Sequence, residues 1–246
     1  MSDYLNELET FWDEFAEEYE AIQQESTFPI AKDLRDFLLE ENILPCQSFL
    51  DLAGGTGRYL TAFQKYVKKY DLVDISKEML KLAGTKAGEN VQLIKQDQKT
   101  FLHLNKHSYD IAFTAMNPVL QTKTDFLDFC QVSKNWCLIL RVVKDEDQLF
   151  SSYEDKNPDL LLNDRYKIFL NELGISYHTK IFSYTKQEDI SREFFQEYFA
   201  DDFSPAKLAE IIESTFGDAQ EKSNQKFLDF ELIYFQVPKA YNENGF

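Results

Sequence analysis

A short apolar strand that runs through glycines into a helix is the feature of this sequence that most restricts its fold. Residues 48–52 are apolar enough for a buried strand, residues 53–57 read Ala-Gly-Gly-Thr-Gly, and apolar side chains recur at helical spacing from Arg58 to Tyr70. Four further short apolar runs follow up to Val143, with helical patterns between them. Strands that alternate with helices form parallel sheets covered on both faces. We therefore expect an α/β fold.

The last hundred residues follow a different pattern. One helical pattern begins at Pro158 and ends at Gly174, and another begins at the Ser204-Pro205 pair. Strands are predicted over residues 176–184 and 227–237. Because they lack the short strand-to-helix spacing, these strands can add an antiparallel edge to the sheet.

Charge restricts the partners of the chain. The 246 residues include 43 acidic and 26 basic ones, which gives a net charge of -17, and residues 1–31 contain nine acids but no lysine or arginine. Such a surface repels nucleic acid and anionic membranes. The N-terminal stretch has neither a basic leader nor an apolar run, and the longest apolar stretch, near residues 136–143, is too short for a bilayer. We expect a cytoplasmic protein without membrane contact.

The glycine loop brings backbone close to a ligand and points amide groups at it. A phosphate-binding P-loop would need Lys-Ser or Lys-Thr after the glycines, where Arg58-Tyr59 stands, so that interpretation fails. A dinucleotide fingerprint that begins at Gly55 would need glycine at position 60, which is Leu60. Both phosphate-binding interpretations are therefore weak.

The loop resembles motif I, DxGxGxG, of the class I S-adenosylmethionine-dependent methyltransferases. Asp51, Gly55 and Gly57 are in place, and Ala53 replaces the first glycine, which is sterically possible if its φ stays negative. Asp74, in the segment Val73 to Leu80, resembles the second-strand acid that binds the cofactor ribose in this family. A carboxylate suits that role because it accepts two hydrogen bonds from a vicinal diol.

Three more segments extend the resemblance. Asp97-Gln98 follows the third strand, where the family holds adenine with an acid and a backbone amide. Residues 109–114 are similar to the fourth strand, which ends beside the methionine part of the cofactor. The N-terminal helix around Tyr19 and Trp12 resembles the cofactor lid of small-molecule members, although an apolar stripe at helical spacing is equally typical of core.

The resemblance implies a Rossmann-like class I methyltransferase fold, with a mostly parallel seven-stranded sheet, one antiparallel strand and helices on both faces. It implies S-adenosyl-L-methionine as cofactor and S-adenosyl-L-homocysteine as product. The expected single domain comprises a helical cap, a cofactor-binding core and a C-terminal part with a helical insertion, over residues 1–45, 46–150 and 151–246. The cofactor-binding residues it implies are Asp51, Ala53, Gly54, Gly55, Gly57, Asp74, Ile75, Met79, Asp97, Gln98, Thr114 and Tyr19.

The acceptor site should lie beyond the carboxyl ends of the strands, near residues 114–118 and 141–144. Asn117 partly resembles the Asn-Pro-Pro-aromatic motif of amino-group methyltransferases, but a structural turn fits Asn117-Pro118 better. Arg141 could bind an acidic acceptor, though structural pairing is commoner. Aromatic side chains between residues 182 and 203 are expected to cover the acceptor pocket together with the N-terminal helix.

The function predicted from these residues is methyl transfer to a small-molecule acceptor. In-line transfer from a sulfonium requires positioning more than a catalytic residue, so none is assigned. No metal site is expected, because His103 and His107 lack a third ligand. An acidic cap favours cationic or neutral acceptors. Two alternatives remain open: an RNA or protein methyltransferase, and a non-catalytic cofactor-binding module. The sequence does not specify an oligomeric state.

Overall fold

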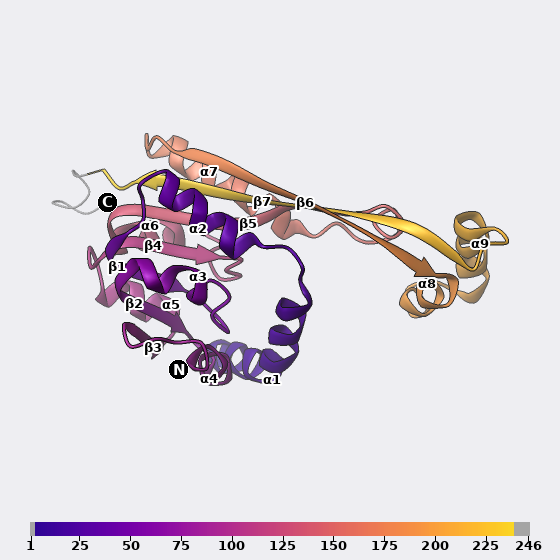
Figure 1. Cartoon of the computed structure of the whole chain (residues 1–246), viewed down its shortest axis with the longest axis horizontal. Coiled ribbons are helices and arrows are strands. Elements are labelled where there is room, and N and C mark those ends of the chain that lie inside the picture. Colours follow the sequence, from indigo (N-terminus) through magenta and orange to yellow (C-terminus); the bar gives the residue numbers. More distant parts are fainter. Residues whose placement is uncertain (1–2, 239–246) are drawn as a thin grey trace. The chain divides into compact units, whose positions relative to one another are not determined.

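The computed structural model describes residues 3–238 (Figure 1). Packing divides the chain into two compact units, each treated separately below. The main unit comprises residues 1–141, 161–182 and 231–246, and the small unit comprises residues 142–160 and 183–230. The single-domain organisation expected from the sequence stays a prediction.

Helices and strands alternate along the chain (Figure 1). In order, the elements are α1 (Asp3–Glu25), α2 (Ile30–Glu40), β1 (Cys46–Leu52), α3 (Leu60–Phe63), η1 (Gln64–Tyr66), β2 (Val67–Asp74), α4 (Lys77–Gly84), β3 (Val91–Lys95), α5 (Gln98–Leu104), β4 (Tyr109–Ala115), α6 (Lys123–Val132), β5 (Ser133–Asp147), η2 (Pro158–Leu161), α7 (Leu162–Glu172), β6 (His178–Ser191), α8 (Arg192–Tyr198), α9 (Pro205–Phe216) and β7 (Glu221–Gln236).

The described strands form one seven-stranded sheet in the order β3-β2-β1-β4-β5-β7-β6. Strands β3, β2, β1, β4 and β5 pair in parallel. Strand β7 is antiparallel to β5, because the amide of Val237 donates to the carbonyl of Asn135 while the amide of Gln148 donates to that of Gln225. The predicted fold, a mostly parallel sheet of seven strands with one antiparallel strand, is confirmed.

The helix predicted from Arg58 to Tyr70 is wrong in its second half. Helix α3 ends at Phe63, and strand β2 already begins at Val67, which pairs with Cys46 at the start of β1. Val67 and Tyr70 are buried while the lysines between them are exposed, a spacing of three that fits a helix equally well. The ladder with β1 outweighs the weak local preference for helix, as tertiary pairing commonly does.

Side chains of β1 alternate between the two faces of the sheet, which places the core of the main unit. Phe49 stacks on Tyr70 with ring centroids 5.0 Å apart and packs against Phe63 of α3 and Phe113 of β4. Leu50 and Leu52 belong to the cluster on the opposite face, which includes residues of α5, α6 and α7. The buried strands are thereby fixed in register, and their carboxyl ends lie along one edge.

The two helices of the expected cap pack differently. The apolar stripe of α2 is buried, and its Phe37 contacts Phe182 and Tyr234 edge-on, so α2 covers strands. Helix α1 instead packs mainly against α4. Within residues 3–238, every helix is either too short or too polar to cross a membrane.

The small unit has a core of its own. It contains α8 and α9, whose buried side chains Phe195, Ile211 and Phe216 pack together with Phe150 and with Phe199, the residue after α8. The aromatic residues expected to cover an acceptor pocket are therefore divided: Phe182 lies in the main unit against α2, and those from Phe194 onward belong to the small unit.

Candidate functional site

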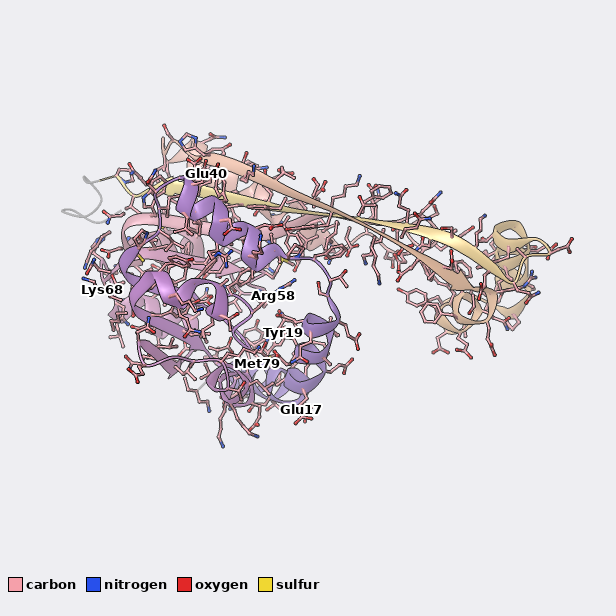
Figure 2. All side chains as sticks on the ribbon, in the orientation of Figure 1. Glu17, Tyr19, Glu40, Arg58, Lys68 and Met79 are labelled. Carbon is pink, nitrogen blue, oxygen red and sulfur yellow. The ribbon has the colours of Figure 1, made fainter. Side chains whose placement is uncertain are left out.

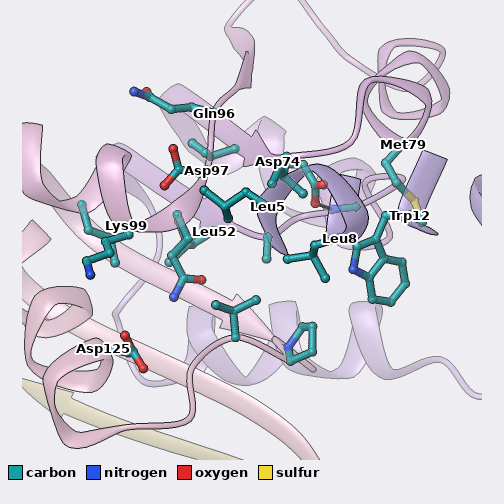
Figure 3. A pocket seen from close by; sticks show the side chains of 18 of the residues that line it. Leu5, Leu8, Trp12, Leu52, Asp74, Met79, Gln96, Asp97, Lys99 and Asp125 are labelled. Carbon is teal, nitrogen blue, oxygen red and sulfur yellow. Dashed lines mark hydrogen bonds between the residues drawn. The ribbon is translucent and has the colours of Figure 1, made fainter. Parts of the chain in front are cut away.

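A cavity of about 350 Å³ lies at the carboxyl ends of β1 to β4 in the main unit (Figure 3). Its floor consists of residues at or just after the ends of these four strands: Ala53 and Gly55 after β1, Asp74 at the end of β2 and Ile75 after it, Gln96, Asp97 and Gln98 after β3, and Ala115 at the end of β4 with Met116 after it. In an open α/β sheet this edge is where ligands bind.

Helix α1 lines the other side of the cavity. The side chains it contributes are those of Tyr4, Leu5, Leu8, Trp12 and Tyr19. Figure 3 shows Leu5 and Leu8 pointing into the space beside Asp74. Because these side chains are mostly apolar, the cavity combines a polar floor with an apolar cover, as small-molecule sites usually do.

Asp74 is the most constrained polar group of the cavity. Its Oδ2 accepts a hydrogen bond from the amide of Gly55 at 2.9 Å, and its Oδ1 accepts one from the amide of Ser76 at 2.9 Å. Burial raises the pKa of Asp74, while these backbone hydrogen bonds partly offset that rise. A carboxylate has about four acceptor sites, so this one is oriented by two bonds and retains capacity for a ligand.

The glycine loop has left-handed backbone at three positions. Gly55 and Gly57 have φ of 54° and 76°, and Ala53 has φ of 55°. The negative φ that would make an alanine sterically easy at this position is therefore not the one that Ala53 adopts. The turn between β1 and α3 requires this conformation, and an alanine there costs about 1–2 kcal/mol through contact of its Cβ with the backbone.

Tyr19 and Met79 flank the loop at Gly55 (Figure 2). A Cβ at Gly55 would lie 3.7 Å from the Tyr19 ring and 3.9 Å from the Met79 sulfur. Burial raises the pKa of the Tyr19 hydroxyl, although the nearby Arg58 charge opposes this effect. Tyr19 thus brings α1 against the glycine loop.

Four residues predicted from the motif do not line the cavity. Asp51 is 1% exposed, and its Oδ2 accepts a hydrogen bond from the Tyr70 hydroxyl at 2.8 Å. Burial raises the pKa of Asp51 to about 7. Gly54 lies against Leu72, since an added Cβ would come within 2.5 Å of the Leu72 Cγ. Asp51 and Gly54 therefore contact β2 and stabilise the glycine loop without lining the cavity.

The other two residues, Gly57 and Thr114, also stabilise the ends of the strands and the loop without lining the cavity. An added Cβ at Gly57 would lie 3.3 Å from the Ala83 Cβ of α4, so glycine permits close packing there. The Thr114 hydroxyl is buried and donates to the carbonyl of Leu52 at 2.8 Å, which ties the end of β4 to the end of β1.

The residues after β3 line the cavity and also form hydrogen bonds that stabilise the segments around it. The Oδ1 of Asp97 accepts a hydrogen bond from the amide of Thr100 at 2.9 Å, so Asp97 is the N-cap of α5 as well as a lining residue. The Gln98 side chain accepts a hydrogen bond from the amide group of Asn117 at 2.6 Å.

The two predicted substrate residues do not line the cavity. Asn117 and Arg141 are each 2% exposed. The Asn117 Oδ1 accepts a hydrogen bond from the amide of Val119 at 2.9 Å, and Arg141 donates to the Asn117 carbonyl at 2.8 Å. Both residues thus brace the turn after β4, in agreement with the structural turn favoured at Asn117-Pro118.

Sequence reasoning missed several lining residues. Val119 lies in the turn after β4, while Asp125 and Asp128 lie three residues apart on α6. No motif marks these positions. Met116, with φ of 53°, does line the cavity and lies within residues 114–118, which the rule about strand ends places near the acceptor. The face of α6 could not be assigned without the structure.

Three acidic side chains anchor α1 to the rest of the main unit. The Oδ1 of Asp13 accepts hydrogen bonds from the Ser76 hydroxyl at 2.6 Å and the Glu78 amide at 3.1 Å, at the N-terminus of α4. Glu9 pairs with Lys95 at 2.5 Å. The acidic run therefore serves partly as attachment, which its composition did not reveal.

Glu20 provides the third anchor. Its two carboxylate oxygens lie 2.7 and 2.8 Å from the Nζ of Lys86, which also donates to the carbonyl of Thr56 at 2.9 Å. One ammonium group therefore joins α1, the glycine loop and the segment after α4. Among residues 3–238, no group of three or more potential metal ligands is found.

Residues 49–135 match the family described as "Methyltransferase domain". No curated protein matches the chain in sequence. The fold is similar to that of magnesium protoporphyrin IX methyltransferase from Synechocystis PCC 6803 with bound SAH, with a TM-score of 0.52 and 13% identity over 93% of this chain and 99% of that chain. The same protein with bound SAM gives a TM-score of 0.50 at 13% identity, over 94% of this chain and 98% of that chain.

Precorrin 8w decarboxylase from Methanobacterium thermoautotrophicum has a TM-score of 0.52 and 12% identity, over 82% of this chain and 89% of that chain. A decarboxylase on the same fold shows that the sheet alone does not fix the reaction. The family match says more about the site than the fold does. It extends from β1 to the start of β5 and includes the glycine loop, Asp74 and Asp97. Residues 49–135 therefore match the methyltransferase-domain family, and the chain has the fold of magnesium protoporphyrin IX methyltransferase.

Proposed function

We propose that this chain transfers a methyl group from S-adenosyl-L-methionine to a small-molecule acceptor held beneath α1. This proposal depends on the observation that α1 covers the cavity. Five side chains of α1 line it, and Asp13, Glu20 and Glu9 attach that helix to the main unit. A polymeric acceptor would need an open groove beside the cofactor, whereas a covered cavity suits a small one.

The residues of the floor fit the proposed cofactor. Asp74 is oriented by two backbone amides and would accept hydrogen bonds from the ribose hydroxyls. Asp97 and the backbone at Gln98 would hold the adenine, and the loop at Ala53 and Gly55 would meet the methionine end. Ile75 and Met79 supply apolar contacts beside these polar groups.

The bound cofactor supplies a methyl group on a positively charged sulfur, and the chain supplies position. Trp12 and Tyr19 offer aromatic faces at the cavity, which stabilise a nearby positive charge. Asp125 and Asp128 add negative charge to the cavity wall, so cationic or neutral acceptors are favoured over anions. The covered site excludes water and holds the two reactants in line. We assign no general base, and the cytoplasmic location expected from the sequence belongs to this proposal.

Calorimetric titration with S-adenosyl-L-homocysteine tests the cofactor assignment. We expect the wild type to bind and Asp74→Ala to bind at least about tenfold more weakly, because hydrogen bonds to a charged group contribute roughly 1.5–3 kcal/mol. Asp74→Asn keeps one acceptor oxygen and should lie between them. Asp36→Asn, at an exposed position of α2, removes the same charge away from the cavity and should bind like the wild type.

The acceptor assignment needs a separate measurement. Release of S-adenosyl-L-homocysteine would be followed with panels of small amines and phenols, and with total RNA and total protein as competing acceptors. Turnover on a small molecule supports the proposal. Turnover only on RNA or protein refutes the acceptor class, and binding without any turnover supports a non-catalytic module instead.

A further inference from the structure

Two aromatic side chains are half exposed side by side on α8 of the small unit. Phe194 is 50% exposed and Tyr198 is 49% exposed, and they lie one helical turn apart with ring centroids 6.2 Å from each other. Beneath them, the buried Phe150 meets Tyr198 edge-on at 5.0 Å and Phe194 at 6.3 Å. The two rings therefore rest on a packed core and present their outer faces to solvent.

The pair is held in place by its surroundings. Ser191 caps α8 by accepting a hydrogen bond from the amide of Phe194 at 3.1 Å. On the same helix, Phe195 is fully buried against Phe216. The Tyr198 hydroxyl donates to a carboxylate oxygen of Glu154 at 2.6 Å, which fixes the ring. Because these side chains are already held in place, binding of a partner would cost them little conformational entropy.

The small unit is strongly acidic. Residues 142–160 and 183–230 contain 17 acidic and 7 basic residues, and with the nine acids of residues 1–31 they account for more than the whole net charge of -17. The rest of the chain is slightly positive. Six exposed acids flank the aromatic pair: Glu193, Glu197, Asp201 and Asp202 lie near it in sequence, and Glu154, which accepts the hydrogen bond from the Tyr198 hydroxyl, is followed by Asp155.

The positive charge in this region is small by comparison. Arg192, at the start of α8, is engaged with the carboxylate of Glu213 at 3.2 Å and with the carbonyl of Gly217. Lys156 is exposed beside Asp155. The field around the aromatic pair is therefore negative, which repels nucleic acid and equally repels a second copy of the same acidic unit.

Aromatic faces among carboxylates match the chemistry of one side chain in particular. The guanidinium of arginine stacks on aromatic rings and forms two parallel hydrogen bonds to a carboxylate, whereas the lysine ammonium is a compact, strongly hydrated charge. We propose that the α8 surface, defined as Phe194, Tyr198 and the six flanking acids, binds an arginine-rich segment of a partner protein. This proposal is independent of the activity of the main unit.

Fluorescence anisotropy of the full chain with a labelled peptide tests it. The probe is a 12-residue peptide of alternating arginine and glycine, and its counterpart has lysine at each arginine. We expect the arginine peptide to bind at least about threefold more tightly than the lysine peptide, because only guanidinium both stacks and binds carboxylate in two places. Binding of the arginine peptide should weaken as salt rises.

Matched variants distinguish binding at the α8 surface from non-specific attraction of the peptide to acidic side chains elsewhere. The double variant Phe194→Ser, Tyr198→Ser should bind the arginine peptide at least about tenfold more weakly, since it removes both stacking faces. The double variant Glu193→Gln, Glu197→Gln should bind the arginine peptide more weakly, and the binding should depend less on salt. The control pair Glu14→Gln, Glu18→Gln removes the same charge from exposed positions of α1 and should leave binding unchanged.

Circular dichroism and thermal melts would establish that each variant is folded. If the aromatic double variant fails to fold, the single change Phe194→Ser, at a position half exposed to solvent, replaces it. The proposal is overturned by equal affinity for the arginine and lysine peptides, by wild-type affinity in the aromatic variants, by equal loss in the α1 control, or by no binding of the arginine peptide.

Discussion

The ion pair between Lys86 and Glu20 should determine how firmly α1 closes the cavity. Replacing Lys86 with methionine removes the ammonium group that joins α1 to the carbonyl of Thr56, while it keeps a long apolar side chain. The Glu20 carboxylate then has no positive partner in a setting where its side chain is 11% exposed. We expect α1 to detach more readily and the cavity to lose its cover.

The expected magnitude follows from the geometry. At 2.7 Å, two unit charges attract with about 6 kcal/mol at an effective dielectric constant of about 20, before the cost of removing them from water. Removing one partner of a buried pair costs about 3–5 kcal/mol. Because the Lys86 side chain is 23% exposed, water compensates in part, and we expect about 2–3 kcal/mol for Lys86→Met. Glu20→Gln keeps an acceptor for Lys86 and should cost about 1 kcal/mol.

A double-mutant cycle isolates the pair. Urea unfolding would be followed by the fluorescence of Trp12, which lies on α1 at the cavity, in a Trp136→Phe background that removes the other tryptophan. Hydrogen exchange over residues 3–25 and the affinity for S-adenosyl-L-homocysteine would show whether the loss is local to α1. We expect a coupling energy of about 1–2 kcal/mol between the two positions.

The pH dependence gives a second check on the same pair. Burial alone would raise the pKa of Glu20, but hydrogen bonds from Lys86 and from Gln24 lower it below the ordinary 4.5. The stability from this pair is therefore present above pH 4.5 and is lost as the pH falls through the lowered pKa. The reasoning is refuted if the coupling energy is below about 0.5 kcal/mol, or if the difference between wild type and Lys86→Met does not shrink in acid.

Two further changes test the support of the glycine loop. Burial raises the pKa of Asp51 from 3.8 to about 7, so its ionisation destabilises the fold as pH rises between these values; Asp51→Asn should remove up to about 4 kcal/mol of that dependence, and unchanged urea midpoints between pH 4 and 8 relative to wild type would contradict this. Ala53→Gly relieves about 1–2 kcal/mol of left-handed strain against about 0.4–1 kcal/mol of added chain entropy, so we expect thermal melts to show a fold up to about 1.6 kcal/mol more stable. Ala112→Gly in buried β4 should instead lower stability, and equal losses in both variants would refute the assignment of strain.

The sheet and the floor of the cavity were accessible from sequence for a physical reason. Apolar runs such as 91–95 and 109–115 are bounded by polar turns, and glycines mark where the backbone must turn tightly after β1. Parallel strands bring their carboxyl ends together, so the positions of Asp74 and Asp97 after successive strands suffice to place both at one edge of the sheet.

Other features depend on contacts that no local pattern contains. Residues 67–70 have a spacing that suits helix and strand equally, and only pairing with β1 decides between them. The positive φ of Ala53 follows from the path of the loop and not from its side chain. The anchoring role of Glu20 required the position of Lys86, 66 residues further along the chain. No linker in the sequence marks the small unit, because β5, β6 and β7 each cross one of its boundaries.

The strand order has a consequence for how the chain is completed during synthesis. Strand β7 follows β6 in the chain, yet it lies between β5 and β6 and joins β6 to the rest of the described sheet. Until Glu221–Gln236 has emerged, β5 has an unpaired edge and β6 has no neighbour. A nascent chain with such open edges is exposed to mispairing. Closure of this sheet therefore waits until β7 has been synthesised, and premature termination before β7 should yield an aggregation-prone product.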